Sequence, residues 1–359
     1  MKRILLIALT LIIGLWLVAG PLAVGTYLRT WGPAWIETWG PTTSHQFDSG
    51  WFESRMAAEW PDGSRMVLTG RHLPPTRPAW LALIGEFQSV RTPDPIRIKG
   101  RFGVFGNLEL TMTSPRLKLN EAIELDAGRP AVRILQQASG AFELEANFAY
   151  LEMTDARANR LQLEASKLRV DWKPRSQNKA DLELALDTGR DGQDPSHARL
   201  EFLHVDRRAL AEFVTGFEQF RVARPDSFEA RMAALTMAGA WQQLAEAGLE
   251  VELKRLDLDG QARFSGRWEP ATGHPQISGD GITQSLLDWL QPIIGLVGDV
   301  DTEDAEREAR AWLEALANRR WLHTQDDTFH FRFDGAKAGE NRANTVPVPE
   351  HIGTESPPG

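Results

Sequence analysis

The chain contains no cysteine among its 359 residues. Disulfide bonds, thiolate nucleophiles and thiolate metal sites are therefore excluded. This composition is compatible with an oxidising compartment and does not prove one. Basic residues are in the minority, with 40 Lys and Arg against 49 Asp and Glu and a formal net charge of -9. The chain thus lacks the basic footprint of a nucleic-acid-binding protein, and we expect no nucleic-acid partner.

Familiar catalytic patterns are also missing. The sequence has no G-x-S-x-G nucleophile elbow, no G-x-x-x-x-G-K-[ST] phosphate loop and no H-E-x-x-H zinc motif. Gly100, Gly103 and Gly106 have the wrong spacing for a dinucleotide loop, and turns between strands explain them. We therefore predict that the protein is not an enzyme and has no catalytic residues and no cofactor.

One cluster of histidines and carboxylates suits a divalent metal, namely His323, Asp326, Asp327 and His330. Its spacing fits no known set of metal ligands. Asp326 and Asp327 are also typical of a turn before a strand. We therefore predict no metal site here.

An acidic run begins like a calcium loop with Asp299, Asp301 and Glu303. Asp304 stands where that loop requires Gly, and Arg310 stands where it requires a bidentate Glu. We interpret these acids as helix-capping residues.

What the chain does have is one long apolar run near its start. Lys2 and Arg3 precede the uncharged residues from Ile4 to Val24. As a helix this run is about 30 Å long, which matches the hydrocarbon core of a bilayer. Positive charge on its short N-terminal side predicts that this end stays in the cytoplasm and that the rest crosses. Residues 1–25 are therefore predicted to be a membrane anchor or signal, and no second long apolar run follows.

A cleaved signal peptide is the alternative, with Ala23-Val24-Gly25 as the small-residue site before Thr26. The run is longer than the usual apolar region of a signal peptide, which favours an uncleaved anchor. Tryptophans at four-residue spacing follow it and fit either an aromatic belt at the membrane surface or packing on the body; they are Trp31, Trp35 and Trp39.

Most of the remaining sequence alternates polar and apolar residues with the two-residue period of half-buried strands. In the stretch 161–172, for example, Leu168, Val170 and Trp172 alternate with Arg169 and Asp171. Strands with one polar face predict antiparallel pairing, since buried parallel strands read as continuous apolar runs. We predict an α+β, β-rich fold of long antiparallel twisted sheets with a few packed helices, after one N-terminal transmembrane helix.

Helical spacing of apolar residues predicts a small number of helices. The expected segments are 77–90, 207–220 after an Asp206 N-cap, a short piece at 241–247, 283–297 and 302–320.

A break at residues 223–226 predicts a boundary between modules. The sequence just after it, Phe228 to Ala234, repeats Phe52 to Ala58 with one Ser/Ala difference, which suggests a duplicated unit that opens with a strand. We therefore predict four parts, with an anchor or signal at 1–25, a β-rich module at 26–220, a second β-rich module with two helices at 221–335 and a disordered tail at 336–359.

Residues 228–290 resemble an uncharacterised family of proteobacterial membrane-anchored periplasmic proteins. The resemblance comprises a strand, a short helix at Trp241, a hairpin over 249–268, Gly279-Asp280-Gly281 and a Leu-rich helix. The strand at 329–335 is similar to a late strand of that family. Separately, residues 48–55 are similar to the G-x-F-S-S segment of the YdgA-like family, with Glu53 where that family has Ser.

These resemblances imply a tethered, β-rich envelope protein in the style of the AsmA-like proteins that handle lipids. Neither family supplies catalytic residues that transfer to this chain. We expect a single-pass protein of the bacterial inner membrane, with its bulk in the periplasm, that binds a lipid or other amphiphile. A scaffold or interaction module for an envelope complex fits the same strand pattern, and an envelope hydrolase is a third hypothesis. The expected partners are the inner membrane and either a lipid or an envelope protein.

Overall fold

The computed structural model describes residues 42–335, apart from 51, 73–78, 90–91, 93, 104–105, 121–122, 156, 158, 191–192, 224–226 and 299. The predicted anchor, the tryptophans that follow it and the predicted tail lie outside the described residues. Within the described ranges, no helix has the length and apolar character needed to cross a membrane. The transmembrane helix therefore stays a prediction.

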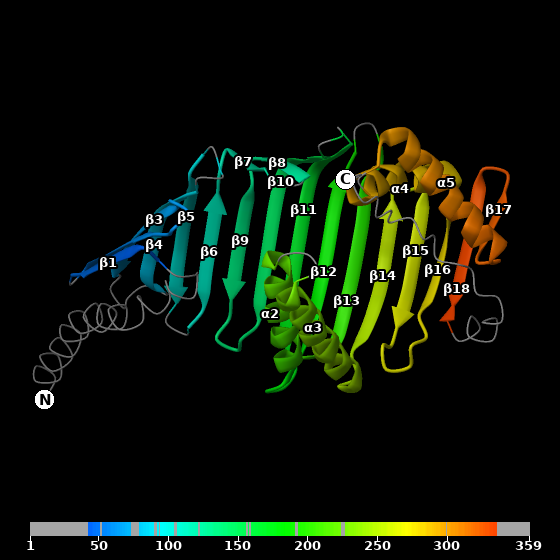
Figure 1. Cartoon of the computed structure of the whole chain (residues 1–359). Helices are drawn as coiled ribbons and strands as arrows, with labels where there is room; N and C mark the ends of the chain where they lie inside the picture. The colour runs from blue at the N-terminus through cyan, green and yellow to red at the C-terminus, as the bar shows by residue number, and fades with distance from the viewer. Residues whose placement is uncertain are drawn as a thin grey trace, which may run out of the picture.

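The described strands form a single sheet of 18 strands. Figure 1 shows this long sheet with the described helices lying on it as two pairs. The first nine strands are β1 (Ser44–Ser49), β2 (Glu53–Glu59), β3 (Arg65–His72), β4 (Ala79–Gln88), β5 (Ile96–Gly103), β6 (Leu108–Thr113), β7 (Arg116–Asn120), β8 (Ile123–Gly128) and β9 (Ala131–Gln136). The other nine are β10 (Phe142–Asp155), β11 (Arg160–Pro174), β12 (Lys179–Gly189), β13 (Ser196–Asp206), β14 (Glu250–Leu258), β15 (Ala262–Trp268), β16 (Gln276–Ile282), β17 (Leu322–Gln325) and β18 (Thr328–Asp334).

The strands follow the chain across the sheet with few exceptions. The pairings run β1 to β6 in order, then β9 to β16, then β18 and β17. The hairpin of β7 and β8 is attached through β8 to the second half of β10, whose first half pairs with β9. All these pairings are antiparallel, so the predicted β-rich, mainly antiparallel class with some helices is confirmed.

Two helical pairs are inserted between strands, and local caps start three of the helices. The helices are α2 (Arg207–Val222), α3 (Phe228–Glu246), α4 (Thr283–Gly298) and α5 (Thr302–Asn318). The side chains of Asp206, Ser227 and Asp301 accept hydrogen bonds from backbone N–H groups in the first turns of α2, α3 and α5. The helices predicted at 207–220, 283–297 and 302–320 are confirmed, and Pro292 lies inside α4 without ending it.

Both helical pairs cover the same face of the sheet, as β15 shows. Trp268 lies 5.5 Å, between ring centroids, from Trp241 of α3. Ala262 and Phe264 belong to the cluster under α4 and α5. These three positions on β15 differ by even numbers, so their side chains point to one face.

Three buried clusters hold the fold together. The largest joins α4 and α5 to β14, β15, β17 and β18, and its buried members are Leu258, Ala262, Leu287, Ala309, Leu313, Leu322 and Phe329. A second lies among β2, β3 and β5, with Met56, Ala58, Met66, Leu68 and Ile98. The third joins the base of the α2–α3 hairpin to the sheet through Val205, Ala209, Leu244 and Leu249.

The helix predicted at 77–90 is wrong, because residues 79–88 of this segment form strand β4. It pairs along one edge with β3 and along the other with β5. Leu83 and Phe87 lie on one face, while Ile84 lies on the other, and an irregularity in the pairing falls between Ala79 and Leu81. Apolar residues on both faces hide the two-residue period, and their spacing imitates a helix. Hydrogen bonding on both edges decides the outcome.

The strand predicted from Phe228 is also wrong. Residues 53–59 form β2, whereas the similar residues 228–234 begin α3. Ser227 caps the second copy, and a sequence rich in Ala, Leu, Met and Gln continues it as a helix. The short helix predicted at 241–247 is the end of this longer one. The match at 52–58 therefore does not mark a repeated structural unit.

The predicted module boundary falls in the α2–α3 hairpin. β13 and β14 pair directly across it, with Phe202 opposite Val251. The sheet is therefore continuous from the predicted first module into the second, and the range 221–335 holds α3, α4 and α5. The division into modules stays a prediction.

Phe329→Ala tests the cluster under α4 and α5. Phe329 has 0% exposed surface and its ring stacks on Phe264 with a centroid distance of 5.5 Å. The cavity left by the substitution should lower the free energy of unfolding by about 3–5 kcal/mol in chemical denaturation. Phe52→Ala, at a side chain 67% exposed, is the control and should change it by less than about 0.5 kcal/mol. Equal effects would contradict the assignment of this core.

Candidate functional site

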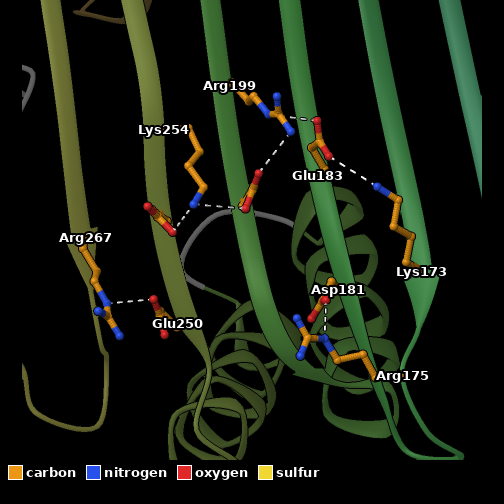
Figure 2. Close-up of polar contacts among 10 residues, drawn as sticks. Lys173, Arg175, Asp181, Glu183, Arg199, Glu250, Lys254 and Arg267 are labelled. Atoms are coloured by element: carbon orange, nitrogen blue, oxygen red, sulfur yellow. Dashed lines mark hydrogen bonds and ion pairs between the residues drawn. The ribbon is translucent and has the colours of Figure 1, made fainter.

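The sheet carries most of its charges on the face opposite the helices. Figure 2 views this polar face, with α2 and α3 behind the sheet. Glu183 forms ion pairs with Arg199 at 3.0 Å and with Lys173 at 3.5 Å. Lys254 and Arg267 make similar pairs on the neighbouring strands.

These ion pairs form a chain from strand to strand. The linked residues on β11 to β14 are Lys173, Glu183, Arg199, Glu201, Lys254 and Glu252. Each solvent-facing pair contributes little to stability, about 0–1 kcal/mol. Their collective effect is that acids and bases neutralise one another, so the polar face presents no block of one charge to a ligand.

The face under the helices carries three continuous rows of side chains, which we call the apolar face. Its middle row follows cross-strand partners from β6 to β14, namely Leu110, Ile134, Leu144, Val170, Leu184, Leu200 and Leu253. One flanking row is Met112, Val132, Ala146, Leu168, Leu186, Ala198 and Leu256. The other is Leu108, Gln136, Phe142, Trp172, Leu182, Phe202 and Val251. Gln136 is the single polar residue in the three rows.

The middle row is longer than a lipid acyl chain. Neighbouring strands lie about 4.8 Å apart, so seven strands extend over about 29 Å. The hydrocarbon core of a bilayer is about 30 Å thick and holds two leaflets, so one acyl chain extends over about 15 Å. An extended chain that crosses the strands would thus contact apolar side chains along its whole length.

Helices pack on residues of the two flanking rows of this face, and the middle row is not part of any buried cluster. Phe202 and Val251 pack against the base of the α2–α3 hairpin. Leu256 packs against the cluster under α4 and α5. The seven middle-row residues are half-buried and belong to none of the three buried clusters in the described part of the chain.

Helix α2 extends an apolar stripe above the same face. Leu210 packs on the sheet at its base. Val214 and Phe217 follow at helical spacing on the side of Leu210, yet they are 50% and 47% exposed. Phe220 lies one turn further on and is 48% exposed. In Figure 1 the hairpin passes in front of the middle of the sheet. The sheet and α2 therefore face each other with apolar side chains that are not in full contact.

Two cavities have mainly polar linings, and the second touches the middle row at Leu253. The first, about 300 Å³, lies at the strand ends near α4 and is lined by Arg160, Leu161, Gln162, Arg190, Gln193, Asp259, Asp288 and Pro292. Within it, Asp259 accepts hydrogen bonds from Ser196 and from the indole of Trp289. The second, about 610 Å³, is lined mainly by polar-face residues of β14, β15, β16 and β18. Their acids and bases are mixed, so neither cavity favours an ion of one sign.

The predicted absence of a metal site concerns His323, Asp326, Asp327 and His330. His323 and His330 are cross-strand partners on β17 and β18, and both are exposed. Asp326 and Asp327 form the turn between these strands, with Asp326 at a φ of 53°. Among the described residues, no group of three or more His, Asp or Glu is placed to hold a metal ion.

The second acidic run is placed as a helix start. Asp301 caps α5 by accepting from the backbone N–H of Asp304 at 2.8 Å, and Glu303 lies in the first turn. The interpretation of Asp301 and Glu303 as helix-capping acids is confirmed, while Asp299 lies outside the described residues.

A buried acid lies where β8 meets β10. Asp126 forms an ion pair with Arg116 and accepts a hydrogen bond from the hydroxyl of Tyr150 at 3.1 Å. Burial, and then the hydrogen bond to Asp126, raise the pKa of Tyr150. A phenol with a raised pKa is a poorer proton donor, so the arrangement suits the attachment of the β7–β8 hairpin better than acid catalysis.

No family model matches the chain, and neither a curated protein nor a solved structure matches it significantly. The resemblances to uncharacterised periplasmic proteins and to the YdgA-like and AsmA-like proteins therefore stay predictions.

Sequence patterns located most strands of the apolar face and the stripe on α2, but not their arrangement. The register across β6, β9 and β10 depends on the insertion of the β7–β8 hairpin, which no sequence pattern predicts. The alternation of Leu108, Leu110 and Met112 with Glu109 and Thr111 indicates which side chains of β6 share a face, but it does not indicate the strand with which β6 pairs.

Asn147→Ala tests the electrostatics of the polar face. The amide of Asn147 donates to Glu145 at 3.0 Å and, followed by Lys167, lowers the pKa of Glu145 below its ordinary 4.5. The substitution should raise that pKa in a carboxyl NMR titration. A pKa of Glu145 that is lower in the folded state than in the unfolded state stabilises the folded state at pH values above about 4.5. As pH falls below about 4.5, the free energy of unfolding should therefore decrease more for the wild type than for the variant. Gln162→Ala should leave the Glu145 titration unchanged, and an unchanged titration in Asn147→Ala would contradict the assignment.

Proposed function

We propose that this protein is a membrane-tethered envelope protein that binds the acyl chains of a lipid or other amphiphile along its apolar face, without catalysing a reaction. The observation that carries the proposal is the middle row, an unbroken line of aliphatic side chains on seven strands that are half-buried and belong to none of the three buried clusters. Large apolar surfaces left open on a folded protein mark sites of interaction.

The energetics of this row favour an apolar ligand. Complete burial of a Val or Leu side chain gains about 1.5–3 kcal/mol, and half-buried side chains gain part of this when covered. Seven such residues together supply several kcal/mol. The hydrogen-bonded sheet is formed before binding, so a ligand would not have to order the backbone it contacts.

The exposed apolar residues of α2 favour a narrow, extended ligand. Val214, Phe217 and Phe220 lie on the helix side of the same face and are about half exposed. A ligand between them and the sheet would meet apolar groups from two sides. An extended acyl chain fits this description better than a folded protein partner.

The predicted anchor supports the location. A run of apolar residues at 4–24 after two basic residues would hold the body at the outer face of the inner membrane, close to a supply of amphiphiles. The ligand would bind on the apolar face, between the two helical pairs. The polar face, where acids and bases neutralise one another, would remain in water.

Leu184→Glu tests this function in the full-length protein. Membranes that contain a photoreactive phospholipid would be irradiated, and the adducts would be mapped on the protein by mass spectrometry. In the wild type we expect adducts on β10 to β13. A charge in the middle row should reduce them at least about tenfold, because a carboxylate is costly to cover with hydrocarbon.

Ala185→Glu is the matched control, since it places the same charge on the next residue of β12, which points to the polar face. Its adducts should equal those of the wild type, and thermal unfolding should confirm that both variants are folded. Equal labelling of the two variants, or a wild type labelled only outside β10 to β13, would overturn the proposal. Cross-links to another protein at these strands would favour a scaffold.

A further inference from the structure

The outer side of α3 is the second exposed apolar surface of the molecule. Phe228, Met232 and Leu235 are 73%, 45% and 65% exposed. Leu244, near the end of the same helix, is buried in the cluster at the hairpin base. Leu235 lies nine residues from Leu244, which is two and a half turns, so it points away from the buried side. Phe228 lies about two turns before Leu235 and shares its direction.

Charge is absent from this helix over an unusual length. The 14 residues from Met232 to Ala245 include no Asp, Glu, Lys or Arg. A helix on a protein surface normally places charged residues on its outward side, and a helix apolar on all sides is normally covered. The stretch is about 21 Å long, too short to span a bilayer of about 30 Å. Because the stretch has no charged residue, its outer side can rest on hydrocarbon without burying a charge.

We propose that the outer side of α3 docks on a lipid bilayer surface. This is a contact separate from the apolar face of the sheet, and it rests on the membrane tether of the proposed function but not on its ligand. A fully exposed large aromatic side chain offers about 150–250 Å². Phe228, Met232 and Leu235 are 73%, 45% and 65% exposed, so together they offer at most about 500 Å². This small area favours a bilayer as the occupant. Each partner in a stable protein–protein interface contributes about 800 Å². Lipid requires no such minimum or complementary shape.

The predicted tether permits this contact. Residues 25–43 lie between the apolar run and β1, and 19 residues can reach at most about 65 Å. Ten strand spacings separate β1 from β13, from which the hairpin begins, and they amount to about 48 Å. A chain anchored at its N-terminus can therefore bring α3 to the same membrane.

Site-specific fluorescence on the full-length protein tests the docking. Because the chain has no cysteine, Leu235→Cys or Met232→Cys can each carry a single environment-sensitive label. Both sites are exposed, so the substitutions should not affect folding. Lys173→Cys, at a side chain 64% exposed on the polar face, is the matched control. Each variant would be reconstituted in vesicles of phosphatidylethanolamine and phosphatidylglycerol.

Quenching by nitroxide-labelled acyl chains would then be compared with quenching by iodide in the water. We expect lipid quenching at 235 and 232 to exceed that at 173 by at least about threefold, since an interfacial helix buries its apolar side about 5–10 Å deep. Iodide should reach only residue 173. Equal access of iodide to 235 and 173 would overturn the proposal. Protection of 235 from both quenchers would also overturn it and indicate a protein partner or a second copy of the chain.

Discussion

The structure depends on the alternation of side chains across a single antiparallel sheet. Each strand points successive residues to opposite faces, so the separation of charge from hydrocarbon survives only if every pairing keeps its register. From β6 to β14 the three apolar rows stay aligned, although irregularities interrupt the pairings of β11 with β12, β12 with β13 and β13 with β14. Where β14 has an irregularity between Leu253 and Leu256, the extra residue keeps both leucines on the apolar face. A slip by one residue at any strand would place charges among the leucines.

This constraint explains why one face of the sheet is charged and the other is apolar. On the polar face, acids and bases on neighbouring strands neutralise each other, so the sheet can remain in water there. On the other face, two helical pairs bury apolar residues at opposite ends of the strands, through the clusters around Leu244 and Phe329. The middle row belongs to neither cluster and stays half-buried. This incomplete burial follows from where the helices are inserted, and it motivates the proposed ligand.

Much of the fold followed from the sequence, because alternation and capping are local signals. The strands at 161–172 and 249–268 and the helices after Asp206 and Asp301 could be predicted in this way. β4 could not, since Ile84 adds an apolar residue to its second face and only the neighbouring strands decide between helix and strand. Residues 228–234 have the sequence of a strand at 52–58, but Ser227 and the residues that follow make them helical. The middle row was also beyond prediction, because it exists only once the register between distant strands is known.

The central claim is that acyl chains lie against the middle row. It is tested most directly by methyl NMR of the full-length protein with protonated Leu and Val methyl groups in an otherwise deuterated chain and deuterated detergent, with protonated phospholipid added. The account predicts nuclear Overhauser effects from lipid methylenes to Leu144, Leu184 and Leu200. Contacts that are absent from these residues, while the spectrum shows a folded protein, would contradict it.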